Sequence, residues 1–279
     1  MRVSESRSVL ITGCSSGIGR CTADMLKARG YRVFATARRA EDVAELAKAG
    51  FEAVQLDLSQ PDSIRAAVAR VLEMTGGTLY GLFNNGAYGQ PGAVEDLSLE
   101  ALKQQFDTNF FGTHELTRLV IPVMRRQGYG RIIQNSSVLG FAAMKFRGAY
   151  NASKFALEGL TDTLRLELRG SGVEVSLIEP GPIESRFRDN ALKQYLAHVD
   201  PTGSPHETTY ENLVARLVKV GPAAPFTEGP ESVARRVIHA LEARRPKVRY
   251  HVTFPTSLFA VLKRILSDRA MDWVLSKIN

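Results

Sequence analysis

The feature that most constrains the fold is a short apolar run followed at once by a cluster of glycines. Residues 8–12 read S-V-L-I-T, and residues 13–19 read G-C-S-S-G-I-G. A continuous apolar run is typical of a strand buried on both faces of a parallel sheet. The pattern over residues 18–29 indicates a helix that ends at Gly30. A strand, a glycine turn and a helix in this order predict a phosphate-binding site at the helix N-terminus.

Short apolar runs alternate with helical patterns along the rest of the chain. Strands are expected at residues 31–36, 53–56, 79–83, 130–135, 173–178 and 247–250. Helices are expected between them, including a long stretch at 99–126 interrupted by Gly112 and Pro122, and others at 150–169 and 231–243. This alternation predicts one α/β domain over residues 1–279, with ligand-binding groups at the carboxyl ends of parallel strands.

Composition and charge limit the partners of the chain. The 279 residues carry 36 Lys and Arg against 29 Asp and Glu, so the net charge of +7 suits phosphorylated cofactors and other acidic ligands. The basic residues are spread out without interleaved aromatics, which argues against nucleic-acid binding, and the His residues have no metal-ligand spacing. Cys14 and Cys21 form no disulfide framework, and no run reaches the ~18 apolar residues of a membrane span. We therefore expect a cytoplasmic protein without a metal site.

The end of the second expected strand bears on the choice of cofactor. A Rossmann unit that binds NAD(H) places an acidic residue here, where it hydrogen-bonds the adenosine ribose. This chain has Ala37, Arg38 and Arg39 instead. An Arg at this place is suited to pair with a 2′-phosphate, which favours NADP(H) over NAD(H). The alternative is that Arg38 only begins a solvated helix.

Tyr150 and Lys154 belong to the run Y-N-A-S-K and lie on one face of the expected helix. Free Tyr ionises near pH ~10. A cation close to the phenol favours its ionised form, so that Tyr is able to exchange a proton with a carbonyl or alcohol oxygen. Such a pair is expected by chance in a chain with eight Tyr, and its meaning therefore depends on the other motifs.

Taken in order, these motifs resemble those of the short-chain dehydrogenase/reductase family, most closely over residues 8–185. They are T-G-C-S-S-G-I-G at 12–19, Asp57 after the third strand, N-N-G-A at 84–87, Asn109, Ser137 thirteen residues before Tyr150, Y-N-A-S-K at 150–154 and P-G-P-I-E-S at 180–185. Within the family the chain is most similar to bacterial NADPH-dependent aldehyde and carbonyl reductases, which are related to hydroxysteroid and retinol dehydrogenases. The resemblance implies a single doubly wound Rossmann fold with a seven-stranded parallel sheet and helices on both faces.

The resemblance also implies a catalytic set of Asn109, Ser137, Tyr150 and Lys154. Ser137 would stabilise charge on the substrate oxygen, and Tyr150 would donate the proton when a carbonyl is reduced. Lys154 would lower the pKa of Tyr150 and hold the nicotinamide ribose, while Asn109 would anchor a water chain that resupplies the proton. Ser136 is the rival for the serine role, but the spacing to Tyr150 selects Ser137. For Asn109 the alternative is that it only interrupts local helical hydrogen bonds.

Cofactor contacts follow from the same resemblance. The phosphates would lie at Gly13, Ser15, Gly17, Ile18 and Gly19. The adenosine half would contact Arg38 through its 2′-phosphate, Asp57 and Leu58 through its adenine, and Asn84 through its ribose. The nicotinamide half would contact Tyr150 and Lys154 through its ribose, and Pro180, Gly181, Ile183 and Ser185 through its ring.

Three positions depart from the family pattern. Gly86 and Ala87 are transposed relative to the usual N-N-A-G, and because both are small we expect only a slight backbone adjustment. Ser185 replaces a frequent Thr and retains its hydroxyl. Ser16 stands where many NADP-using relatives carry a basic residue, so the predicted NADP(H) preference depends mainly on the end of the second strand.

Two segments remain for the substrate. Residues 186–229 mix aromatic and polar residues with several Pro and Gly, and we expect a lid over an apolar pocket. The alternative is a surface excursion whose aromatics dock on the core.

Residues 252–279 are expected to form a helical extension with an apolar stripe beside Lys263 and Arg264. We favour packing of that stripe on the domain or on a second subunit over peripheral contact with a membrane.

The sequence thus predicts an NADPH-dependent oxidoreductase that reduces the carbonyl of an apolar aldehyde or ketone. The alternatives are an NADP-dependent hydroxysteroid- or retinol-type alcohol dehydrogenase and a 3-oxoacyl-thioester reductase. A non-catalytic NADPH-binding sensor is disfavoured, because it would not need all four catalytic residues. The family also implies a homodimer or homotetramer that pairs through the helices near 99–126 and 150–169.

Overall fold

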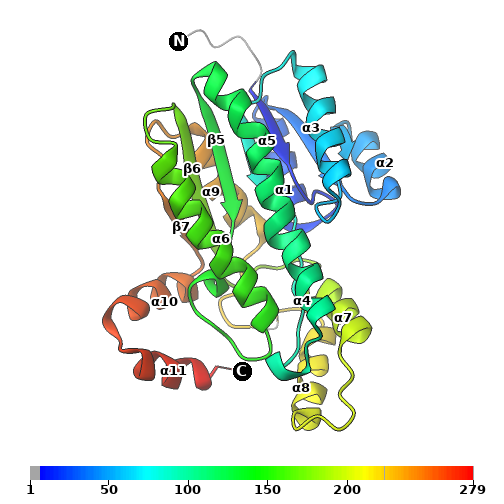
Figure 1. Ribbon diagram of the computed structural model, residues 1–279, viewed down its shortest axis with the longest axis vertical. Helices are drawn as coiled ribbons and strands as arrows, with labels where there is room; N and C mark the ends of the chain where they lie inside the picture. The colour runs from blue at the N-terminus through cyan, green and yellow to red at the C-terminus, as the bar shows by residue number, and fades with distance from the viewer. Residues whose placement is uncertain (1–6, 223, 279) are drawn as a thin grey trace.

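Seven parallel strands form one sheet in the order β3-β2-β1-β4-β5-β6-β7 (Figure 1). The computed structural model describes residues 7–222 and 224–278. The strands are β1 (Ser8–Ile11), β2 (Arg32–Ala37), β3 (Glu52–Gln55), β4 (Gly81–Asn84), β5 (Gly130–Asn135), β6 (Val173–Pro180) and β7 (Arg249–Val252). The strand order reverses between β1 and β4, where doubly wound sheets bind ligands. The predicted doubly wound fold is confirmed.

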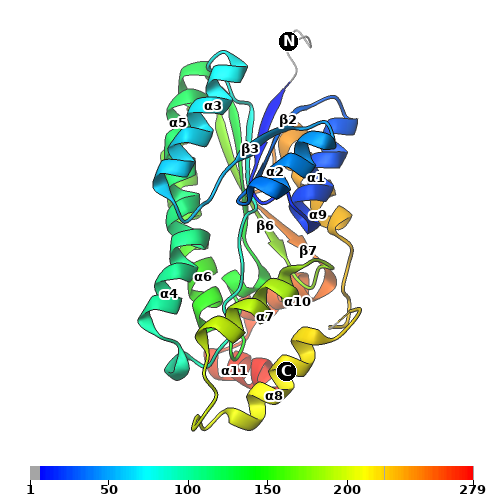
Figure 2. The same cartoon turned by 90° about the vertical axis from the view of Figure 1, so that its right-hand side faces the viewer.

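Helices cover both faces of the sheet, as Figure 2 shows from the side. On one face lie α3 (Pro61–Thr75), α5 (Gly112–Gln127) and α6 (Gly148–Glu167); on the other lie α1 (Gly17–Ala28), α2 (Ala40–Lys48) and α9 (Pro230–Glu242). Beyond the carboxyl ends of the strands lie α4 (Leu99–Phe106), α7 (Phe187–His198), α8 (Glu207–Val218), α10 (Phe254–Ile265) and α11 (Asp268–Ser276). Short turns are η1 (Val94–Asp96), η2 (Asp107–Phe111) and η3 (Val138–Gly140).

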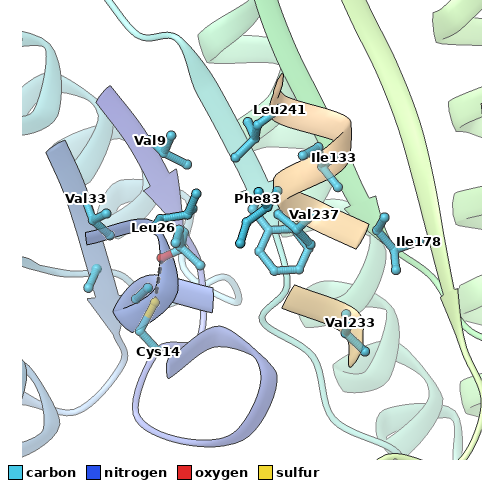
Figure 3. Packing of buried hydrophobic residues seen from close by; sticks show 14 of the residues in the cluster. Val9, Cys14, Leu26, Val33, Phe83, Ile133, Ile178, Val233, Val237 and Leu241 are labelled. Carbon is cyan, nitrogen blue, oxygen red and sulfur yellow. Dashed lines mark hydrogen bonds between the residues drawn. The ribbon is translucent and has the colours of Figure 1, made fainter. Parts of the chain in front are cut away.

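Two apolar layers hold the sheet between its helices. In the layer of Figure 3, Val9, Phe83 and Ile178 of the strands pack with Leu26 of α1 and Val237 of α9, and all five are buried. The layer on the opposite face combines the strands with α3 and α5. Strands buried on both faces favour apolar side chains at successive positions, which explains the run Val-Leu-Ile at 9–11.

The helical stretch at 99–126 is interrupted once, next to Gly112, and not at Pro122. The break is η2, a π-helical turn that ends directly before Gly112, the first residue of α5, whereas Pro122 lies inside α5. A Cβ at Gly112 would lie 1.9 Å from the backbone oxygen of Leu58. This glycine is therefore required for close packing against the segment after β3, and it does not end the helix.

The segment at 186–229 contains two helices, α7 and α8, which the sequence pattern did not reveal. Tyr195 of α7 and Tyr210 of α8 are buried, with ring centroids 5.5 Å apart. The Tyr210 hydroxyl accepts a hydrogen bond from the backbone N–H of Ala93, at 2.9 Å. Aromatic side chains thus hold the segment on the loop that follows β4.

The C-terminal extension packs on its own domain. Phe259 of α10 and Met271 of α11 are buried beside Val138 and Leu139, directly after Ser137. Val261 and Ile265 of α10 remain exposed. Among the described residues, no helix is both long and apolar enough to cross a membrane.

Candidate active site

The glycine loop between β1 and α1 forms a cradle at the sheet's switch point. Gly13 and Gly17 adopt φ of +71° and +56°, a region that side chains disfavour. A Cβ at Gly19 would lie 2.2 Å from the backbone oxygen of Gly13. Ser16 caps α1 without a hydrogen bond from its side chain, which leaves the first amides of the helix to a ligand. Open amides and the positive end of the helix dipole fit a phosphate group.

Asn85 joins this loop to the ends of β4 and β5, a role that the sequence analysis missed. Its Nδ2 donates to the backbone oxygens of Thr12, at 2.9 Å, and Gly13, at 3.2 Å. Its Oδ1 accepts from Nδ2 of Asn135 at 3.0 Å. In the sequence, the signal that could have pointed to this role was the second Asn of N-N-G-A. The predicted Asn84 lies deeper and donates to Oγ1 of Thr117 at 2.8 Å.

The transposed glycine has a physical reason in the structure. A Cβ at Gly13 would lie 2.9 Å from Cα of Gly86. A Cβ at Gly86 itself would lie 2.9 Å from the Leu58 side chain and 3.3 Å from Oγ1 of Thr12. The glycine loop therefore touches the backbone of the segment after β4 at Gly13, and Gly86 fits closely against the side chains of Leu58 and Thr12.

Arg38 stands exposed directly after β2. Its backbone oxygen accepts from Nε2 of Gln55 at 3.0 Å. Arg39, by contrast, forms an ion pair with Asp42 at 2.8 Å. Within residues 7–222 and 224–278 no carboxylate pairs with Arg38. The Asp57 carboxylate is engaged by Ser59, accepting from its N–H at 2.9 Å and from its hydroxyl at 2.8 Å.

The structure brings Ser137, Tyr150 and Lys154 together beyond the end of β5. The hydroxyl of Ser137 accepts from the backbone N–H of Leu139 at 3.1 Å and is hydrogen-bonded with the Tyr150 phenol. Nζ of Lys154 donates to the backbone oxygen of Asn135 at 2.7 Å, and it lies 5.7 Å from the centroid of the Tyr150 ring. The rival Ser136 is buried and faces the Glu158 carboxylate.

Burial changes the pKa of both titratable groups of this set. It raises the pKa of Tyr150 to about 12, against the opposing effects of the Ser137 hydrogen bond and the Arg147 charge. It lowers the pKa of Lys154 to about 8, against the opposing charge of Glu158. At neutral pH the phenol is therefore protonated and able to donate a proton, while Lys154 is close to losing its charge.

Asn109 lies buried in the π-helical turn η2. Its Oδ1 accepts from the N–H of Tyr88 at 3.1 Å, and its Nδ2 donates to the oxygen of Tyr88 at 2.9 Å and to Oγ of Ser153 at 3.3 Å. The side chain therefore fastens the loop after β4 to α6. The predicted water-anchoring role of Asn109 stays a prediction.

The segment 180–185 links the sheet to the substrate end. The N–H of Gly181 donates to the oxygen of Val252 at 3.0 Å, and Ile183 pairs with Glu228 in a parallel bridge. Cβ of Ser185 lies 3.0 Å from the place that a Cβ on Gly17 would take. The predicted nicotinamide segment thus begins at buried Pro180, the last residue of β6, and ends against the glycine loop.

Phe187, at the start of α7, lies against the Tyr150 phenol. The two rings meet edge to face with centroids 5.3 Å apart. The Phe187 ring also lies 2.7 Å from the place that a Cβ on Gly89 would take. An apolar wall therefore stands beside the proton donor. The described residues contain no group of three His, Cys, Asp or Glu suited to a metal ion.

Comparisons with known proteins agree with this geometry. The sequence model of the short chain dehydrogenase family matches residues 7–196. The chain is 46% identical to the uncharacterized oxidoreductase YbbO of Escherichia coli K12, over 96% of this chain and 94% of that protein. It is 33% identical to human retinol dehydrogenase 8, over 95% of this chain and 87% of that protein.

Solved structures share the fold and include complexes with both nicotinamide cofactors. A short-chain dehydrogenase/reductase from Burkholderia phymatum in complex with NAD has a TM-score of 0.78 at 27% identity, with 99% of this chain and 97% of that chain covered. A short chain dehydrogenase from Burkholderia cenocepacia in complex with NADP has a TM-score of 0.75 at 21% identity, with 97% and 98% covered. From the matched motifs, the sheet and these relatives we conclude that the chain is an oxidoreductase of the short-chain dehydrogenase/reductase family.

Proposed function

We propose that the protein uses NADPH to reduce the carbonyl of an apolar aldehyde or ketone to the alcohol. The observation that carries this proposal is the Ser137–Tyr150 hydroxyl pair, with the Phe187 ring against the phenol. A proton donor, a hydrogen-bonding hydroxyl and an apolar wall are the groups that carbonyl reduction requires from the protein.

Each residue has a role that follows from its surroundings. NADPH, when bound, supplies the hydride that the carbonyl carbon accepts. The Ser137 and Tyr150 hydroxyls hold the carbonyl oxygen and stabilise its developing negative charge. Tyr150 then gives its proton to that oxygen, which completes the alcohol. Lys154, as an ammonium, favours the phenolate that remains and hydrogen-bonds the nicotinamide ribose.

The preference for NADPH is proposed from the end of β2. The exposed guanidinium of Arg38, which pairs with no carboxylate among the described residues, suits a 2′-phosphate. The adjacent Ala37 offers no carboxylate that would hydrogen-bond the ribose of NAD(H) or repel the phosphate. The glycine cradle and the open first turn of α1 would hold the pyrophosphate.

The substrate class is proposed from the wall at Phe187 and from the relatives. A pocket lined by aromatic side chains favours an apolar substrate. Similarity to human retinol dehydrogenase 8 supports this class and keeps one second candidate, oxidation of an apolar alcohol with NADP⁺ by the same residues in reverse. Reduction favours a protonated phenol, and burial keeps the pKa of Tyr150 high, at about 12.

We also propose a cytoplasmic homodimer or homotetramer that pairs through α5 and α6. Phe155 and Leu166 of α6 and Phe111, the last residue of η2 directly before α5, are large apolar side chains that stand exposed. Light scattering on a Phe155→Glu, Leu166→Glu double variant tests this part. A smaller particle than the wild type supports pairing at these helices, and an unchanged mass refutes it.

The central test is a spectrophotometric screen of NADPH and NADH oxidation. The panel holds short and long aldehydes, apolar ketones, steroids and a 3-oxoacyl thioester, and the reverse reaction is run with retinol and NADP⁺. We expect turnover of long apolar aldehydes or ketones with NADPH. Faster oxidation of retinol would favour the second candidate, and NADPH binding without any turnover would contradict both.

A further inference from the structure

A buried cluster of charges lies behind the catalytic residues and has no part in the mechanism proposed above. Glu158 of α6 and Glu179 of β6 are only 7% and 0% exposed. Arg249 of β7 forms ion pairs with both, from Nη2 to Glu158 Oε2 at 3.1 Å and from Nε to Glu179 Oε1 at 3.0 Å. Nε2 of His251 lies 3.0 Å from Oε2 of Glu179. Buried carboxylates are costly unless they are paired, so this cluster requires an explanation.

Glu158 is one helical turn from Lys154. The two residues are at positions i and i+4 of α6 and therefore share a face of the helix. Both are buried, and Lys154 is only 3% exposed. Burial lowers the pKa of Lys154, and the charge of Glu158 raises it. Because the lysine is close to losing its proton at about pH 8, a change in that one charge alters its protonation near neutral pH.

The surroundings of the two carboxyl groups differ. Burial raises the pKa of Glu158, and the Ser136 hydroxyl and the Arg249 guanidinium act against this shift by favouring the charged form. Glu179 is fully buried, and burial together with the negative charge of Glu158 raises its pKa to about 8. The two carboxyl groups therefore titrate together and hold one proton at neutral pH, with the Ser136 hydroxyl and the Arg249 guanidinium favouring the negative charge on Glu158.

Other charged groups face this cluster from each element around it. On α6, Asp162 pairs with Arg249 at 2.7 Å and with Arg165 at 2.7 Å. On β7, burial lowers the pKa of His251, and the charges of Arg264, Arg249 and Lys247 lower it further. A neutral His251 beside Glu179 is consistent with one proton held by the two carboxyl groups of Glu158 and Glu179.

We propose that Glu158 is a positioning residue that acts through Lys154. Its buried carboxylate, held in the charged form by Arg249, is the counter-charge that keeps Lys154 an ammonium. Glu158 does not touch the substrate. It sets the upper pH at which Lys154 supports proton transfer from Tyr150. The proposal rests on the function proposed above, but it is a statement about the charge of one lysine and is testable without turnover.

The experiment measures the titration of Lys154 directly. The full-length protein is labelled with ¹³C-lysine, the Lys154 signal is assigned with Lys154→Arg, and its chemical shift is followed from pH 6 to pH 10. The wild-type midpoint is expected at about 8. In Glu158→Gln the midpoint should fall by about one pH unit, because the counter-charge is gone. Glu158→Asp, which keeps a carboxylate, should restore most of the shift.

Two matched controls separate charge from structure. Glu179→Gln resembles the protonated Glu179 and leaves Glu158 charged, so the Lys154 midpoint should stay in place. Asp162→Asn removes another partner of Arg249 from the same helix, and it too should leave the midpoint unchanged. Equal shifts in all three variants would indicate a general loss of packing and would overturn the proposal.

Activity supplies an independent measurement if the screen finds a substrate. In Glu158→Gln the alkaline limb of the kcat profile should move to lower pH with the Lys154 midpoint, while the two controls keep the wild-type profile. If Glu158→Gln does not fold, Arg249→Gln tests the same charge from β7. Glu158 then takes up a proton, so the Lys154 midpoint again falls. An unchanged midpoint in the folded variant refutes the role of Glu158, whether or not any carbonyl is turned over.

Discussion

The cofactor side and the substrate side of the candidate site are built in different ways. On the cofactor side, close packing occurs at Gly13, Gly19 and Gly86. An added Cβ at these residues would lie 2.9 Å from Cα of Gly86, 2.2 Å from the backbone oxygen of Gly13 and 2.9 Å from the Leu58 side chain, respectively. On the substrate side, Phe187, Tyr195 and Tyr210 hold α7 and α8 in place through ring contacts. Backbone contacts leave no room for change, whereas side-chain contacts can be exchanged one at a time. We therefore expect the cofactor side to tolerate few substitutions, and the substrate side to tolerate substitutions that change the choice of substrate.

The largest effect is expected at Tyr150, where the two sides meet. Tyr150→Phe removes the proton donor and keeps the ring that contacts Phe187, so kcat should fall by about 10²–10⁴-fold while NADPH still binds. Steady-state kinetics and NADPH fluorescence titration measure the two effects. Tyr129→Phe, which alters an exposed ring, is the control and should keep full activity. Normal kcat in Tyr150→Phe would refute the assigned proton donor.

Adding one methyl group at Gly19 tests whether the backbone packing of the glycine loop tolerates a side chain. In Gly19→Ala the new Cβ meets the backbone oxygen of Gly13 at 2.2 Å, so the loop must shift. We expect a loss of about 1–3 kcal/mol in the free energy of unfolding and a large loss of NADPH affinity. Urea unfolding and fluorescence titration provide the measurements.

Gly159→Ala is the matched control for that variant. Gly159 also lies in a helix, but among the described residues of the protomer no atom outside the neighbouring backbone of α6 lies within 4 Å of its added Cβ. The substitution should stabilise the protein by about 0.5–1 kcal/mol, because alanine loses less backbone entropy than glycine. If Gly19→Ala and Gly159→Ala changed the free energy of unfolding and the NADPH affinity equally, the glycine loop would be no more tightly packed than the helix α6.

The cofactor preference should depend on one side chain of the cofactor side. Arg38→Asp replaces the guanidinium proposed to bind the 2′-phosphate, so kcat/KM with NADPH should fall by about 10–100-fold and that with NADH should not fall. Arg39→Asp is the control, because Arg39 is already paired with Asp42. An unchanged ratio of NADPH to NADH use in Arg38→Asp would mean that another residue recognises the phosphate.

The smallest effect is expected on the substrate side. Phe187→Ala removes one edge-to-face contact with Tyr150, of a kind that contributes about 0.5–1.5 kcal/mol. KM for an apolar substrate should rise a few-fold, with NADPH affinity unchanged. Phe226→Ala, at an exposed ring that lies tilted against Phe254 with centroids 5.2 Å apart, should change neither quantity. A strong loss of NADPH binding in Phe187→Ala would show that the two sides are not separable.

The sequence by itself determined the features that depend on short stretches of chain. The apolar run before the glycines predicted a buried parallel strand and a helix N-terminus, and both are present in β1 and α1. The spacings between Ser137, Tyr150 and Lys154 placed them on a strand end and one helix face, and the structure brings them together. Such features are predictable because helix and strand periods place neighbouring residues without reference to the rest of the fold.

Only the tertiary structure decided the contacts between distant segments. Gly112 resembles a helix interruption in the sequence, but it is required by the backbone of Leu58. Asn85 is a second asparagine in the sequence, and only the approach of β1, β4 and β5 shows that it joins the three strand ends. The pairing of Glu158 and Glu179 with Arg249 crosses from α6 to β6 and β7. No local period relates these residues, because strand order and helix packing alone set the distances between them.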